Sequence, residues 1–86
     1  MLTEIDLIYQ SASHPDHRIG FELKTSSQWK AEYSAPLMDL LEQKLLSKGY
    51  GIYLGEHPQK IGQVEILNIH SFLKDLWNGK IISIPT

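Results

Sequence analysis

The chain has 86 residues, of which 42% are hydrophobic and 21% are charged, and its formal net charge is −2. This length and composition predict one small globular domain, residues 1–86, rather than a disordered chain. The slight acidic excess argues against a domain that grips a nucleic-acid backbone by overall charge, although a local patch or a bound cation can supply that charge. Cysteine is absent, which excludes disulfides and thiolate metal sites.

Nothing in the sequence indicates a membrane or export. No apolar run approaches the roughly 20 residues that a membrane-spanning helix needs. The N-terminus lacks the basic region of a signal peptide. We therefore expect a soluble protein of the cytoplasm with no membrane partner.

Two segments near the start of the chain have the alternating pattern of β-strands. In residues 3–9 and 18–25, apolar side chains alternate with polar or small ones, except that Ile8 lies on the side of Glu4 and Asp6. The polar loop Gln10–Asp16 between them suits a relaxed antiparallel hairpin. Pairing of the two strands would place both apolar sets against one core. These sets are Ile5, Leu7 and Tyr9 in the first segment and Ile19, Phe21 and Leu23 in the second.

A leucine-rich amphipathic helix is predicted from Ala35 onward. Its leucines recur at the i, i+3, i+4 and i+8 positions that form one face of a helix. Ser34 is a suitable N-cap, Pro36 suits the first turn, and Gly49 has the position of a left-handed stop. The preceding residues, 26–34, are expected to form a loop or an irregular helical turn.

The second half of the chain predicts a strand, a loop, another strand, a short helix, and a final strand or packed tail. Ser71 is expected to cap the short helix and Gly79 to end it. The residues of this helix that are expected to face inward are Phe72, Leu73, Leu76 and Trp77. The resulting order is β-β-α-β-β-α-(β), which predicts an α/β sandwich: a small mixed β-sheet with helices mainly on one face. The five segments are residues 50–54, 56–62, 63–69, 71–77 and 81–84.

Two carboxylates and a lysine would share one face of the hairpin. Glu22 and Lys24 lie about 6.6 Å apart along a strand and point the same way, and strand pairing puts Asp6 on their side. With the Leu23 carbonyl, the carboxylates suit Mg²⁺, which takes few protein ligands and keeps its waters. The lysine suits a helper in phosphodiester hydrolysis. The spacing alone is more typical of a solvated sheet face.

The order of these segments resembles the PD-(D/E)xK nuclease superfamily. There, a carboxylate on one strand is followed by E-x-K on the next strand, then by a helix and a crossover strand. This chain has E-I-D-L-I-Y, a polar loop, and R-I-G-F-E-L-K-T-S-S. It is more narrowly similar, over residues 4–76, to the nuclease-like C-terminal domain of a family of prokaryotic AAA+ ATPases. The later matching segments are Leu37–Leu46, Gly51–Glu56 and His70–Leu73.

The resemblance implies a restriction-endonuclease-like core. It also implies Mg²⁺ or Mn²⁺ held by Asp6, Glu22 and the Leu23 carbonyl, with Lys24 as the catalytic lysine of an enzyme that acts on nucleic acid. The lead helix and the ATPase domain of that family have no counterpart in this sequence. The chain also has no G-x-x-x-x-G-K-[ST] motif.

Histidines and aromatic residues outside this set have simpler interpretations. We expect the histidines to be exposed residues rather than a zinc site, because no thiolate joins them and Pro15 interrupts the first pair. Pro15-Asp16 matches the letters of the superfamily name but lies in the loop, so Asp6 is the better carboxylate. The rings suit base stacking but are more typical of core anchors. The histidines are His14, His17, His57 and His70, and the rings are Trp29, Tyr33, Tyr50, Tyr53 and Trp77.

A second class of function fits the same fold. A non-catalytic protein-interaction module, as a remnant or partner of an ATPase system, would bind protein through a sheet edge or a helix face. A homodimer that covers an apolar sheet face left open by so few helices is a further hypothesis. The nuclease predicts that Asp6, Glu22 and Lys24 gather around an open concave spot, whereas the module predicts a simple ion pair on a flat solvated face.

Overall fold

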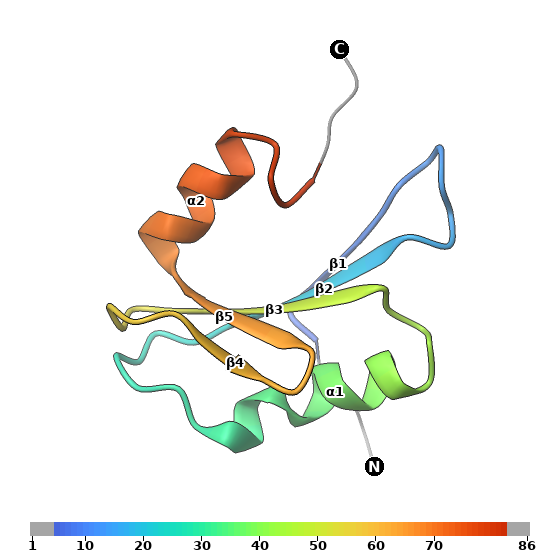
Figure 1. Cartoon of the computed structure of the whole chain (residues 1–86). Helices are drawn as coiled ribbons and strands as arrows, with labels where there is room; N and C mark the ends of the chain where they lie inside the picture. Colours follow the sequence, from blue (N-terminus) through green and yellow to red (C-terminus); the bar gives the residue numbers. More distant parts are fainter. Residues whose placement is uncertain (1–4, 83–86) are drawn as a thin grey trace.

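In a computed structural model of the chain, which describes residues 5–82, a mixed five-stranded sheet carries one helix on each face (Figure 1). This confirms the predicted α/β class. The spatial order of the strands is β1-β2-β3-β5-β4. None of the helices in residues 5–82 is long and apolar enough to cross a membrane. The elements are β1 Leu7–Gln10, β2 Arg18–Leu23, the 3₁₀ helix η1 Ala31–Ser34, α1 Ala35–Glu42, β3 Lys48–Tyr53, β4 Gln59–Ile61, β5 Val64–Asn68 and α2 Ile69–Trp77.

The sheet combines two hairpins with two parallel pairings. β1 pairs antiparallel with β2, as the alternating pattern predicted, and the register, which the sequence left open, puts Leu7 opposite Phe21. The segment containing η1 and α1 then crosses to β3, which runs parallel to β2 and to β5. β4 and β5 form a second antiparallel hairpin. The prediction missed β4, because its three residues lie in a polar stretch with a proline that reads as a loop.

The two helices cover opposite faces of the sheet, so the expectation of helices mainly on one face is wrong (Figure 1). On one side, Leu37 and Leu41 of α1 pack with Val64 and Ile66 of β5. On the other side, residues of α2 pack against β2 and β3. The cause is β3, which is buried on both faces from Gly49 onward. A parallel strand in this position needs a cover on each side.

Gly49 does not end the leucine-rich helix, and that prediction is wrong. α1 ends at Glu42, Lys44 takes the left-handed conformation with φ 60°, and Gly49 lies inside β3. A Cβ at Gly49 would stand 3.3 Å from Leu41 Cδ1. The glycine therefore serves the close approach of α1 to the sheet rather than a turn.

The starts of both helices also differ from the prediction. Ser34 makes no capping hydrogen bond, because its Oγ accepts from Trp29 Nε1 at 2.8 Å. Asn68, rather than Ser71, caps α2 by accepting from the backbone N–H of His70 at 2.8 Å. Gly79 does follow α2 in a left-handed conformation, with φ 75°, as predicted.

The predicted core positions at the start and end of the chain are only partly buried. Leu7 is 58% exposed and Leu23 is 48% exposed, although both lie on the face of the sheet that α2 covers. The expected inward positions of Leu73 and Trp77 are wrong, since Trp77 is 91% exposed. Ile81 is buried outside any strand, while residues 3–4 of the predicted first strand and 83–84 of the predicted last strand lie outside the described residues.

Trp29 packs against the backbone of β3 where Gly51 has no side chain. A Cβ at Gly51 would stand 2.5 Å from the indole ring of Trp29. The ring is buried, and its Nε1 donates to the buried Ser34. Because Gly51 lies opposite Glu22 in the parallel register, the Trp29 ring covers the face of the sheet next to the predicted site.

We expect Gly51→Ala to lower the free energy of unfolding by about 1–3 kcal/mol, because the added methyl group overpacks a filled core. Gly49→Ala is the matched control on the same strand, and its looser contact with Leu41 predicts a smaller loss. Urea denaturation followed by tryptophan fluorescence measures both. Equal losses for the two variants would contradict the packing of Trp29 on Gly51.

Candidate functional site

The structure brings Asp6 and Glu22 together at one end of the β1–β2 hairpin. Leu7 lies opposite Phe21, so Asp6, one residue earlier, lies beside Glu22. One Asp6 oxygen, Oδ2, accepts a hydrogen bond of 2.7 Å from the backbone N–H of Leu23. The carboxylate of Asp6 is thereby held across the end of β2, on the side that the alternating pattern predicted.

Lys24 completes the group. Its backbone N–H donates to the Ile52 carbonyl at 2.9 Å, which extends the parallel pairing of β2 with β3 by one residue. Its Nζ lies 3.6 Å from Glu22 Oε1 and 4.7 Å from the centre of the Tyr33 ring. The ammonium is therefore held between a carboxylate and an aromatic face, both of which favour a cation.

Tyr33 was not part of the predicted site. It reaches Lys24 because η1 packs onto the sheet through Trp29, whose ring meets Tyr33 edge to face with centroids 5.4 Å apart. The only signal of this contact in the sequence is weak, namely two aromatic residues in an otherwise polar loop. Its consequence is that the position of the lysine depends on the loop as well as on β2.

The electrostatics of the site centre on Glu22, which is only 7% exposed. Burial raises the pKa of its carboxyl group above the ordinary 4.5, and the charge of Asp6 and a hydrogen bond to Asp6 raise the pKa further. Lys24 acts in the opposite direction but does not cancel these effects. Two carboxyl groups in contact, one of them buried, favour a proton or a cation between them.

The donor set suits a divalent cation of the magnesium type. Leu23 and Lys24 each engage one oxygen of a carboxylate, and a cation would relieve the repulsion between Asp6 and Glu22. Within residues 5–82, no group of three or more His, Cys, Asp or Glu side chains is placed to hold a metal. An ion here would rest on two carboxylates, a backbone carbonyl and water, which Mg²⁺ tolerates and Zn²⁺ does not favour.

The surroundings of Glu22 match neither the open concave site expected of a nuclease nor the solvated ion pair expected of an interaction module. Lys24 does pair with Glu22, as an interaction module would predict. Glu22, however, is buried rather than solvated, and Asp6 stands exposed at its side. The site is thus a buried carboxylate between an exposed Asp6 and a partly exposed Lys24, rather than a solvated ion pair.

The histidines and aromatic residues that lie outside the predicted site are either exposed or part of the core. All four histidines are exposed, as expected, and Pro15-Asp16 lies in the hairpin turn. Trp29, Tyr50 and Tyr53 are buried core anchors, also as expected. Burial, together with the charges of nearby acids, raises the pKa of the Tyr50 hydroxyl.

Comparisons with family models, with curated proteins and with solved structures find no match to this chain.

Without metal, Glu22→Gln should raise the free energy of unfolding at pH 7, because the folded state raises the pKa of Glu22 above 4.5 and ionised Glu22 therefore destabilises it. In the wild type, protonated Glu22 stabilises the folded state. This stabilisation is fully present below pH 4.5, the pKa of the unfolded chain, and is lost as pH rises through the higher pKa that Glu22 has in the folded state. The advantage of Gln over Glu should therefore shrink toward pH 4.5.

Chemical denaturation in EDTA between pH 4.5 and 8 measures this difference. Glu56→Gln, in an exposed loop, is the control and should show no such trend. A Glu22→Gln variant that is less stable than the wild type across the whole range would show that the contact with Lys24 outweighs the burial of the charge.

Proposed function

We propose that the chain is a cytoplasmic, divalent-metal-dependent nuclease-like domain that hydrolyses nucleic-acid phosphodiesters. The observation that carries the proposal is the grouping of Asp6, Glu22 and Lys24 at one end of a hairpin, with Glu22 buried and Lys24 beside it. The connection from this hairpin through α1 to a parallel strand supports a restriction-endonuclease-like core.

Each residue has a separate part in the proposed chemistry. Asp6, Glu22 and the Leu23 carbonyl would hold Mg²⁺ or Mn²⁺, which when bound supplies an activated water and offsets the phosphate charge. The Lys24 side chain is 36% exposed, so its ammonium can donate to a phosphate oxygen without leaving Glu22. Tyr33 would keep that ammonium over the site as a positioning residue.

Metal binding and phosphodiester cleavage test the proposal together. We expect Mn²⁺ to bind the wild type in a calorimetric titration, and Glu22→Gln or Asp6→Asn to weaken binding at least about tenfold, by loss of a charged ligand. Lys24→Gln should keep the metal but lower the nicking of supercoiled plasmid by about 100-fold or more. Lys30→Gln, on the exposed loop, is the matched control. Absent metal binding together with absent nicking would contradict the enzyme.

A non-catalytic interaction module of the same fold is the second candidate, and an exposed apolar groove favours it. A groove of about 260 Å³ lies between the β1–β2 hairpin and α2, with Leu7, Leu23, Phe72 and Leu76 among its lining residues. β1 forms an edge of the sheet, and its sequence LIYQ has none of the lysines or prolines that protect edge strands. An uncharged edge strand beside an apolar groove suits a second copy paired about a two-fold axis.

The module in this form predicts a homodimer. Light scattering coupled to size exclusion should give twice the chain mass at micromolar concentrations, and Leu7→Lys should convert the dimer to a monomer by placing a charge in the interface. Leu45→Lys, at another exposed leucine away from the groove, is the control. A clean monomer at every concentration would contradict the homodimer without bearing on the nuclease.

A further inference from the structure

A second cavity lies at the tip of the β1–β2 hairpin, away from the carboxylates. It measures about 420 Å³, within the size range of small-ligand sites. Its lining residues Tyr9, Ile19 and Ile81 belong to the core on the α2 face, whereas Glu22 lies on the opposite face, where Gly20 meets α1. The cavity therefore belongs to neither the metal site nor its surroundings.

A tight turn places two imidazoles at the edge of this cavity. The backbone N–H of His17 donates to the His14 carbonyl at 2.8 Å, which closes a four-residue turn with Pro15 at its second position. The two rings lie 5.3 Å apart. We expected Pro15 to separate the two histidines. Instead, Pro15 forms the turn that brings their rings together.

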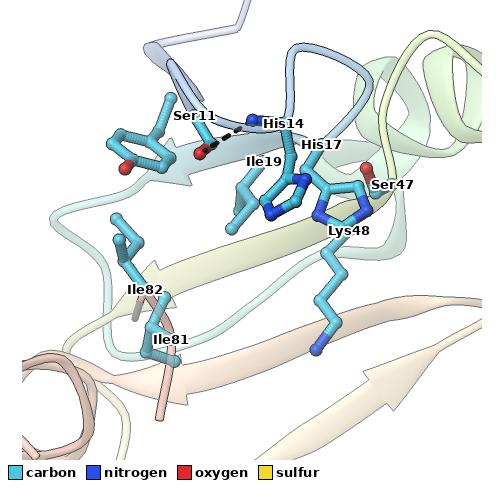
Figure 2. A pocket seen from close by; sticks show the side chains of 9 residues that line it. Ser11, His14, His17, Ile19, Ser47, Lys48, Ile81 and Ile82 are labelled. Atoms are coloured by element: carbon cyan, nitrogen blue, oxygen red, sulfur yellow. Dashed lines mark hydrogen bonds between the residues drawn. The ribbon is translucent and has the colours of Figure 1, made fainter. Parts of the chain in front are cut away.

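Ser47 fixes this turn beside the start of β3. Its Oγ accepts from the backbone N–H of Arg18 at 3.0 Å and donates to the Asp16 carbonyl at 3.2 Å. Lys48 follows directly in the sequence. Figure 2 shows the rings of His14 and His17 and the stem of Lys48 on one side of the cavity, with Ile81 and Ile82 on the other.

The three nitrogen-bearing side chains are free to bind a ligand. Within the described part of the chain, the imidazoles of His14 and His17 make no hydrogen bond and Lys48 makes no ion pair. By contrast, the hydroxyls of Ser11 and Ser47 already bond to backbone groups. A cavity lined by two imidazoles, a long and flexible lysine and an apolar wall matches an anion that carries an apolar body.

We propose that this cavity binds a small phosphate monoester of an aromatic or aliphatic group. The phosphate oxygens accept from His14, His17 and Lys48, and the apolar group lies against Ile19, Ile81 and neighbouring side chains. A phosphate fits better than a carboxylate because it offers three oxygens to three donors. A metal ion fits less well, because the residues that line the cavity offer two imidazoles but no carboxylate or thiolate to complete a metal site.

An NMR titration of the full chain with phenyl phosphate tests the proposal. We expect saturable shifts in residues 11–19, 47–49 and 81–82. We also expect phenyl phosphate to bind about tenfold tighter than phenol, benzoate or inorganic phosphate. Phenol lacks the charged group, inorganic phosphate lacks the apolar group, and benzoate offers one oxygen fewer. Equal responses to phenol or to inorganic phosphate would overturn the proposal, and tighter binding of benzoate would replace the phosphate by a carboxylate.

Matched variants locate the site. His17→Gln and Lys48→Gln should each weaken phenyl phosphate binding about tenfold, while His70→Gln and Lys30→Gln, at exposed positions elsewhere, should not change it. Glu22→Gln should bind phenyl phosphate like the wild type, which separates this site from the proposed nuclease. Stoichiometric Zn²⁺ binding at His14 and His17, with no response to phenyl phosphate, would overturn the proposal.

Discussion

The packing of Trp29 against the bare backbone of Gly51 is the contact on which the candidate site depends. It anchors the loop between β2 and α1, because the same indole bonds to Ser34 and meets Tyr33 at its edge. Tyr33 in turn holds the ammonium of Lys24. Gly51 lies opposite Glu22, so the ring that anchors the loop packs on the residue that is paired with this glutamate. The position of the Lys24 ammonium therefore depends, through Tyr33 and Trp29, on the absence of a side chain at Gly51.

The arrangement of charges opposes stability. A buried Glu22 next to Asp6 costs free energy at neutral pH, and a single lysine offsets only part of that cost. An apolar residue at position 22 would serve the sheet better, since Gly20, its neighbour on the same face, is packed by leucines. Perturbed carboxyl groups kept at such a cost are typical of sites that bind or react. This consideration favours the metal site over the solvated sheet face that the E-x-K spacing alone suggested.

The sequence predicted the hairpin and the convergence of Asp6, Glu22 and Lys24, because a two-residue period fixes which side chains share a face. It could not predict the helices on opposite faces, because Gly49 and Gly51 interrupt the apolar run by which a doubly buried strand is normally identified. It mistook Gly49 for a helix stop, since a glycine that admits a neighbouring helix looks the same as one that turns the chain. The cavity at the hairpin tip depends on contacts between distant segments, which no local pattern encodes.

Strand β2 contributes to both proposed sites, because its successive side chains point to opposite faces of the sheet. Ile19 and Phe21 belong to the α2 face and the core beside the cavity, whereas Gly20 and Glu22 face the other side. A shift of one residue in its pairing would exchange these faces and would damage both sites together. The register is held on one side by β1 and on the other by β3, and Ser47, next to the start of β3, bonds to Arg18 at the start of β2 and to Asp16 in the hairpin turn. Two sites that share no side chain therefore share a single structural requirement, the register of β2.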